Sequence, residues 1–122
     1  MDKDIVILVV EDAAIQREIV LSQLETAGYE EAIGMEDGLE AYSYLEENSA
    51  DLVISDWNMP NMNGLELLIK IRSNPSLQNL PFIVLTVTGD VSSEAMDAGA
   101  SDFISKPTNP ADLVEKIEKI FE

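Results

Sequence analysis

Five short apolar runs recur along the chain, and they constrain its fold more than any other feature. They occupy residues 5–10, 32–35, 52–55, 82–86 and 103–105. Each has the length of a strand and is followed by a helix-like stretch. The first, third and fourth runs are continuously apolar, as is typical of parallel strands that helices cover on both faces. The sequence therefore predicts five βα units in one open, parallel α/β sheet.

The stretches between the runs predict five helices. Ile15, Ile19, Val20 and Leu24 form a stripe that indicates a core-facing helix, which ends near Gly28. Residues 37–47 and a segment beginning near residue 64 predict two further helices. Residues 91–98 contain few apolar anchors, so the fourth helix is expected to be short or mobile.

The last helix is predicted most clearly, because Asn109 suits its cap and Pro110 its first turn. Its apolar stripe is also core-facing and comprises Leu113, Val114, Ile117, Ile120 and Phe121. Trp57 is interpreted as a packing residue, and Met59, Met62 and Met96 as loop and core filler.

Composition excludes most catalytic chemistries. The chain has no cysteine and no histidine, which rules out disulfides, zinc clusters, thiol nucleophiles, haem ligation and Ser-His-Asp triads. Its 122 residues, 46% of them apolar, suit one domain over residues 1–122. The formal charge of −17 repels nucleic acids and anionic lipid surfaces. No apolar run is long enough to span a membrane, so we expect a soluble, cytoplasmic protein.

Charged and polar side chains follow the predicted strands. Glu11 and Asp12 follow the first, Asp56 the third, Thr86 ends the fourth, and Lys106 follows the fifth. Each alone has an ordinary explanation as a cap, turn or loop residue. Because the carboxyl ends of parallel strands share one edge, three carboxylates would meet there and need countercharge. Lys106 and a Mg²⁺ ion would supply it, and a carboxylate can also accept a phosphoryl group.

These residues, with Lys106-Pro107 at the fifth strand, resemble the response-regulator receiver domains of two-component signalling. The similarity spans nearly the whole chain. The stretch Ser-Asp-Trp-Asn-Met-Pro-Asn-Met at residues 55–62 is especially similar to the stand-alone, CheY-like chemotaxis regulators. The resemblance implies a flavodoxin-like (βα)5 fold with strand order 2-1-3-4-5.

The resemblance also implies a chemistry. Asp56 would accept a phosphoryl group from a histidine kinase or a small acyl phosphate. The carboxylates of Asp12 and Asp56 and the carbonyl of Asn58 would bind Mg²⁺, with Glu11 acting mainly through metal-bound water. Lys106 would pair with the phosphoryl group. The protein would catalyse only its own phosphotransfer and autodephosphorylation, and would not be an enzyme acting on outside substrates.

A switch is implied by the same resemblance. Thr86 would swing its hydroxyl to the phosphoryl group, and Phe103 would turn inward to report the change. The Lys106-Pro107 bond would be cis. The output face would comprise the fourth helix, fifth strand and fifth helix, about residues 91–121, and would bind an unknown protein target. The chain is expected to be a monomer with no direct nucleic-acid or membrane partner.

Two departures from the family pattern leave alternatives open. Val87 follows Thr86 where a small residue is usual and could slow phosphorylation. The interval from Thr86 to Phe103 is about two residues short, which truncates the fourth helix. One alternative is therefore a phosphorylation-deficient receiver that works as a binding module.

Two further alternatives are weaker. An aspartyl-phosphate phosphatase would need a second carboxylate where Asn58 stands, together with a cap over its substrate. A flavin-phosphate binder is disfavoured because Glu11 and Asp12 replace a phosphate cradle.

Overall fold

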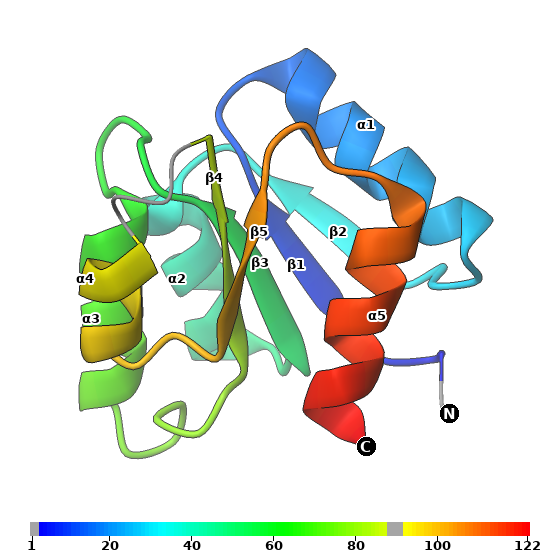
Figure 1. The fold of residues 1–122 in the computed structure, drawn as a ribbon. Coiled ribbons are helices and arrows are strands. Elements are labelled where there is room, and N and C mark those ends of the chain that lie inside the picture. The colour runs from blue at the N-terminus through cyan, green and yellow to red at the C-terminus, as the bar shows by residue number, and fades with distance from the viewer. Residues whose placement is uncertain (1–2, 88–91) are drawn as a thin grey trace.

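The computed structural model describes residues 3–87 and 92–122, which form five strands and five helices in alternation (Figure 1). The sheet is parallel with the order β2-β1-β3-β4-β5, which confirms the predicted fold. The strands are β1 (Ile7–Val10), β2 (Ala32–Met35), β3 (Leu52–Asp56), β4 (Phe82–Thr86) and β5 (Asp102–Ser105). The helices are α1 (Ala14–Thr26), α2 (Gly38–Glu47), α3 (Gly64–Ser73), α4 (Ser92–Asp97) and α5 (Pro110–Phe121).

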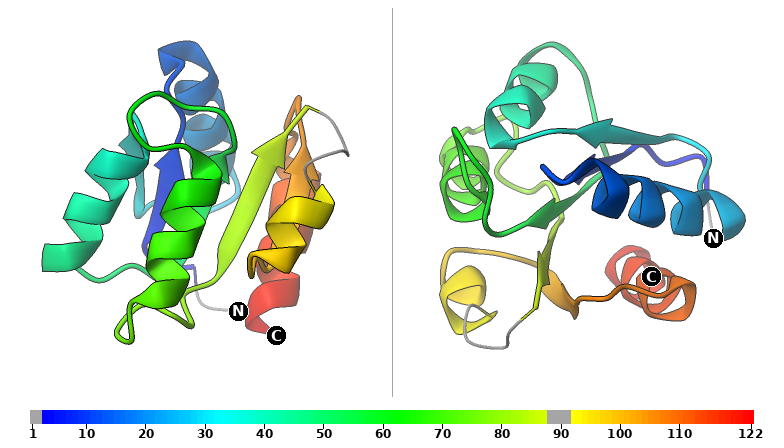
Figure 2. Two further views of the ribbon diagram at one scale, coloured as in Figure 1. Left: turned by 90° about the vertical axis from the view of Figure 1, so that its left-hand side faces the viewer. Right: turned by 90° about the horizontal axis from the view of Figure 1, so that it is seen from above.

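The sheet is the middle of three layers. Helices α1 and α5 cover one face, and α2, α3 and α4 cover the other (Figures 1 and 2). Alternate residues of β1 enter the two cores, so Leu8 and Val10 pack on the side of α2 and α3, whereas Ile7 and Val9 pack toward α1 and α5. All four residues have no exposed surface. The run is therefore continuously apolar because β1 is buried on both faces, as the sequence predicted.

The prediction that the whole apolar stripe of α1 faces the core is partly wrong. Val20 and Leu24 are buried, but Ile15 is 77% exposed and Ile19 43% exposed. Helix α1 begins just beyond the carboxyl end of β1, and Figure 1 shows its first turn above the end of that strand. The first turns of the helix therefore have no sheet beneath them, and only its second half packs on the core.

Helix α4 is short, as its composition predicted: it has six residues, and Ala95 is the buried one among the side chains of residues 93–97. The prediction began this helix at Val91, which lies outside the described residues. Met96 was interpreted as filler but is 46% exposed, so that interpretation is wrong for it. Met59 and Met62 do pack, partly buried, against the core.

The expected helix boundaries have specific causes. Gly28 lies after α1 with a φ of 101°, a left-handed conformation that costs glycine little. The Asn109 side chain accepts a hydrogen bond from the Asp112 N–H and so caps α5. Asp12, for which capping of α1 was the ordinary explanation, is not the cap residue, which is Ala13.

We predict that Gly64→Ala destabilises the fold by about 1–3 kcal/mol, because the start of α3 lies against the end of β3. A Cβ at Gly64 would lie 2.5 Å from the Asp56 carbonyl oxygen and 3.0 Å from the Trp57 Cα, and neither main-chain atom can move away freely. Urea unfolding measures the loss. Gly34→Ala is the matched control, since its Cβ would meet the flexible side chains of Arg17 and Leu21. Equal losses for the two variants would contradict this explanation.

Candidate functional site

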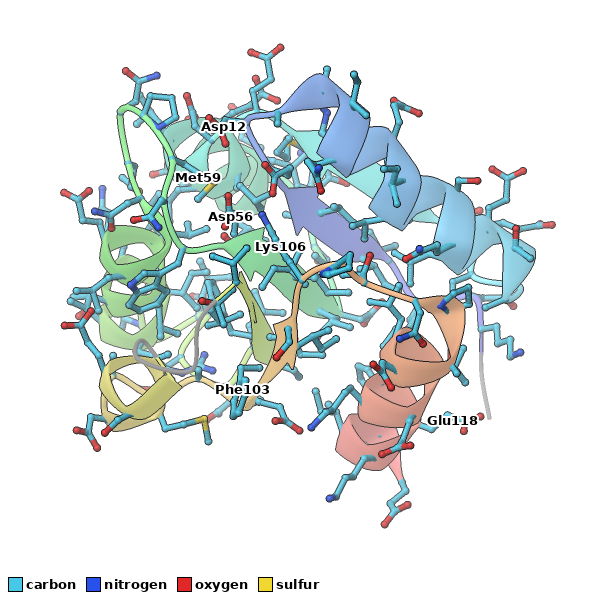
Figure 3. The ribbon with its side chains drawn as sticks, turned by 45° about the horizontal axis from the view of Figure 1, so that its top comes forward. Asp12, Asp56, Met59, Phe103, Lys106 and Glu118 are labelled. Atoms are coloured by element: carbon cyan, nitrogen blue, oxygen red, sulfur yellow. The ribbon has the colours of Figure 1, made fainter. Side chains whose placement is uncertain are left out.

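The predicted site residues meet at the carboxyl edge of the sheet. The register pairs Val10 with Ser55, Asp56 with Leu85, and Thr86 with Ser105, so the strand ends lie side by side. Asp12, Asp56 and Lys106 accordingly cluster above the strands in Figure 3.

Three carboxylates form the floor and rim of the site. Glu11, Asp12 and Asp56 each offer an oxygen, and these oxygens all lie within 4.8 Å of one another. Glu11 is almost fully buried, the Asp56 side chain is 13% exposed, and Asp12 is exposed to solvent. Carboxylates this close repel one another, so the arrangement favours a cation between them.

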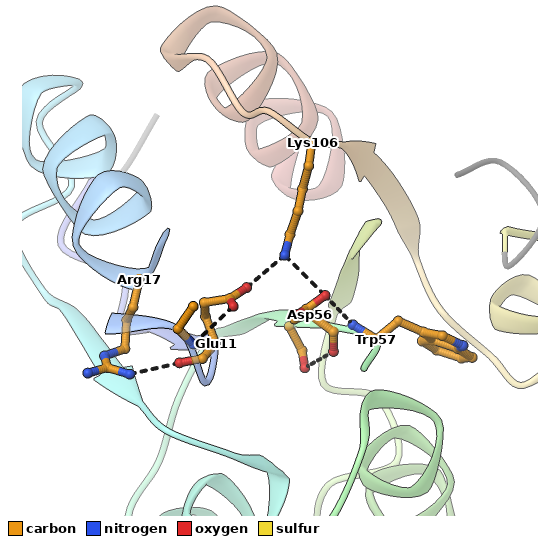
Figure 4. Close-up of polar contacts among 7 residues, drawn as sticks. Glu11, Arg17, Asp56, Trp57 and Lys106 are labelled. Atoms are coloured by element: carbon orange, nitrogen blue, oxygen red, sulfur yellow. Dashed lines mark hydrogen bonds and ion pairs between the residues drawn. The ribbon is translucent and has the colours of Figure 1, made fainter. Parts of the chain in front are cut away.

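Lys106 reaches into the carboxylates from the end of β5. Its Nζ lies 2.8 Å from Glu11 Oε2 and 3.2 Å from Asp56 Oδ1, and Figure 4 shows it bridging the two side chains. The cluster of these three carboxylates and one ammonium is still left with more negative than positive charge. Oxygen-only ligands of this kind suit Mg²⁺, which binds one or two carboxylates and completes its shell with other oxygens.

The main chain around Glu11 is fixed by three contacts. Its N–H donates to the Met35 carbonyl at 3.0 Å, and the Ala13 N–H donates to Glu11 Oε1 at 3.2 Å. Arg17 Nη1 donates to the Glu11 carbonyl at 2.8 Å (Figure 4). Sequence reasoning did not identify Arg17, because a contact to a main-chain carbonyl leaves no pattern of side-chain types.

Asp56 is held where β3 ends. The Trp57 N–H donates to Asp56 Oδ1 at 2.8 Å, and the Ser55 hydroxyl donates to the Asp56 carbonyl at 2.8 Å. The Trp57 side chain is 7% exposed and packs in the core, in agreement with its interpretation as a packing residue. Asn58, the expected carbonyl ligand, follows directly in the loop after β3 and is exposed.

The charges in the site shift two pKa values. Burial raises the pKa of Glu11, and the negative charge of Asp56 adds to the rise, although the hydrogen bond from Lys106 opposes it. Burial alone would lower the pKa of Lys106, but its hydrogen bond to Glu11 and the charges of both carboxylates outweigh burial and raise it. Lys106 therefore stays an ammonium ion at neutral pH.

The two expected switch residues lie on one face of the sheet. Thr86 is 5% exposed at the end of β4, and its carbonyl accepts from the Lys106 N–H at 2.8 Å. Phe103 pairs with Val84, two residues before Thr86, and is partly buried against the core on the side of α2 and α3. Phe103 therefore lies on the same face of the sheet as Thr86, and its part in the switch stays a prediction. Lys106-Pro107 is cis, as the resemblance implied.

Val87 is 73% exposed, so it makes little contribution to the core. The prediction that it slows phosphorylation stays a prediction.

Within the described ranges, no helix has the length and apolarity needed to cross a membrane.

Comparison with known proteins identifies similar chains. A model of the response regulator receiver domain matches residues 7–118. The chemotaxis protein CheY1 of Helicobacter pylori is 38% identical over 117 residues, which cover 93% of this chain and 94% of the relative.

Solved structures agree. The chemotaxis response regulator CheY4 of Vibrio cholerae has a TM-score of 0.85 at 31% identity, covering 93% of this chain and 96% of that one. The receiver domain of a Pseudomonas aeruginosa sensor histidine kinase, solved with a magnesium ion coordinated in its active site cleft, has a TM-score of 0.86 at 25% identity. The match covers 94% of this chain and 95% of the Pseudomonas chain.

We predict that Glu11→Gln gains stability relative to the wild type as the pH rises, when Mg²⁺ is absent. Because the folded-state pKa of Glu11 is raised above its ordinary value of 4.5, the folded protein holds this proton more tightly than the unfolded chain does. The stability that this proton gives the wild type is fully present below pH 4.5 and is lost as the pH rises through the raised pKa of Glu11. Urea unfolding in EDTA from about pH 5 to pH 8 measures the difference, and a constant difference would refute the assignment.

Proposed function

This chain belongs to the response regulator receiver domain family, and we propose that Asp56 is the phosphoryl acceptor of its signalling switch. The observation that carries the proposal is the Lys106 ammonium 3.2 Å from Asp56 Oδ1, at a sheet edge where three carboxylates can also hold a cation. The phosphoryl donor is a phosphohistidine of a histidine kinase, for which a small acyl phosphate can substitute.

The transfer step needs little from the protein except placement and charge. A carboxylate oxygen of Asp56 attacks the phosphorus atom, and a P–O bond forms as the P–N bond to the donor imidazole breaks. The imidazole nitrogen keeps the electron pair of the broken bond and takes up a proton. The product on Asp56 is an acyl phosphate. Lys106 stabilises the phosphoryl oxygens, since its ammonium already contacts the acceptor.

The acidic residues would hold Mg²⁺ in this reaction. Asp12 and Asp56, with the main-chain carbonyl of Asn58, are the proposed ligands, and Glu11 supports them from deeper in the site. The ion would supply positive charge for the phosphoryl oxygens. The magnesium in the Pseudomonas receiver structure supports this assignment.

The output is a change of surface. Thr86 and Phe103 lie on the face of the sheet that α4 partly covers, so a phosphoryl group that draws in the Thr86 hydroxyl would free space for the Phe103 ring. The proposed readout face comprises α4, β5 and α5, and its target is a protein of unknown identity. With α4 only six residues long, β5 and α5 supply most of that face.

The likeness to the Helicobacter chemotaxis protein supports a role in chemotaxis as a further part of the proposal. We also propose a cytoplasmic location and action as a monomer. The protein turns over only its own phosphoryl group, by self-phosphorylation and autodephosphorylation, and does not act on outside substrates.

We predict that acetyl phosphate adds one phosphoryl group to the wild type only when MgCl₂ is present, as measured by intact mass. Trp57 is the sole tryptophan and adjoins Asp56, so its fluorescence should report the reaction. Asp56→Asn keeps the shape of the side chain and removes the nucleophile, so it should gain no mass.

Other results have distinct meanings. Fluorescence that responds to MgCl₂ without any gain of mass would contradict the switch and favour a binding module. A gain of mass in Asp56→Asn would show that another residue is the acceptor.

A further inference from the structure

The start of α2 holds the loop between β3 and α3. The carboxylate of Asp37, the residue before α2, accepts a hydrogen bond at Oδ2 from Asn61 Nδ2 at 2.7 Å. The next residue, Gly38, donates its N–H to the Met62 carbonyl at 3.0 Å. These two contacts join segments that are 24 residues apart in the sequence.

The loop itself has a defined shape. Its base is closed by the Gly64 N–H, which donates to the Trp57 carbonyl at 2.9 Å. Its tip turns tightly, since the Met62 N–H donates to the Pro60 carbonyl at 2.7 Å and Asn61 has a φ of 65°. Asparagine is one of the few residues that adopt this left-handed conformation at small cost. Asn58 therefore lies in a loop that is closed at its base and fixed at its tip.

The contact between α2 and the loop allows little movement. A Cβ at Gly38 would lie 2.6 Å from the Met62 carbonyl oxygen, so the main chains already approach as closely as they can. The Asp37 carboxylate adds a second contact, in which it is a charged acceptor. A hydrogen bond to a charged acceptor is stronger than one to a neutral group. That bond lowers the pKa of Asp37, which therefore stays ionised at neutral pH.

We propose that Asp37 is a positioning residue for the cation site: by holding Asn61, it fixes the loop conformation that presents the Asn58 carbonyl to Mg²⁺. Asp37 does not itself contact the cation. The inference rests on the proposed function, because that function assigns the Asn58 carbonyl as a ligand. Residues that orient metal ligands in this way affect metal affinity although they lie outside the coordination shell.

The two oxygens of Asp37 have separate roles, which makes the inference testable. Oδ1 accepts from the Glu40 N–H at 2.9 Å and caps α2, whereas Oδ2 holds Asn61. Asp37→Asn keeps an oxygen for the cap, since asparagine is as good a cap as aspartate. Its Nδ2 cannot accept from Asn61, so the charged hydrogen bond is lost, and a turned Asn61 amide would restore only a neutral one. Glu36→Gln is the charge-matched control, because it removes one negative charge from the neighbouring, exposed position.

The experiment titrates MgCl₂ into each protein and follows Trp57 fluorescence. We expect the dissociation constant to rise about threefold to tenfold for Asp37→Asn relative to Glu36→Gln. The urea midpoint measured without Mg²⁺ should be slightly lower for Asp37→Asn than for Glu36→Gln, because Asp37→Asn keeps the cap but loses a charged hydrogen bond. With acetyl phosphate, Asp37→Asn should need correspondingly more MgCl₂ for half-maximal phosphorylation, and its rate at saturating MgCl₂ should return to that of the control.

A double-mutant comparison isolates the contact. Asn61→Gly accepts the left-handed backbone, changes no charge and removes the amide donor. It should weaken Mg²⁺ binding in the same direction, and adding Asp37→Asn to it should have no further effect beyond that of Glu36→Gln. Fully additive effects would overturn the inference.

The remaining outcomes separate the inference from the proposed function. Equal Mg²⁺ affinities for Asp37→Asn and Glu36→Gln, with binding and phosphorylation by the wild type intact, would overturn the inference alone. A loss of affinity in Asp37→Asn that Asn61→Gly does not share would assign the effect to the helix cap and overturn the inference too. A wild type that neither responds to MgCl₂ nor accepts a phosphoryl group would overturn both.

Discussion

The electrostatic conflict at the carboxyl edge of the sheet is the constraint on which the rest of the structure depends. A parallel sheet brings the ends of β1 and β3 together, and here those ends carry Glu11, Asp12 and Asp56. One ammonium, that of Lys106, does not balance three carboxylates. The site therefore favours added positive charge, and the same imbalance sets the conditions for phosphoryl transfer. Functional sites of this kind commonly lower the stability of the folded protein.

The fold supports this cluster with rigid elements and leaves its readout to less buried ones. Strand β1, which Glu11 follows, and strand β3, which Asp56 ends, are buried on both faces, and this burial fixes the positions of the two acids. The α2 junction at Asp37 fixes the neighbouring loop from the side. By contrast, α4 is short and Phe103 is only partly buried. A site with a fixed interior and a lightly packed neighbour is suited to a switch between two surface states.

The sequence predicted the fold, and it predicted that Glu11, Asp12, Asp56 and Lys106 meet at one edge, because both depend on local signals. Continuous apolar runs predict buried parallel strands, and the residues after them must meet at one edge. Periodicity failed for Ile15 and Ile19, since it does not show where the sheet beneath a helix ends. It also could not find Arg17, whose partner is a main-chain carbonyl, or the pair Asp37 and Asn61, which only the tertiary fold brings together.

Identification of the phosphorylated residue tests the central claim most directly. Borohydride reduces an acyl phosphate to an alcohol, so protein treated with acetyl phosphate and MgCl₂ and then reduced would carry homoserine at the acceptor position. Peptide mass mapping should find this change at Asp56, and only when MgCl₂ was present. The same change at Asp12, or no change at any aspartate under conditions in which the acyl phosphate of another receiver is trapped, would contradict the account.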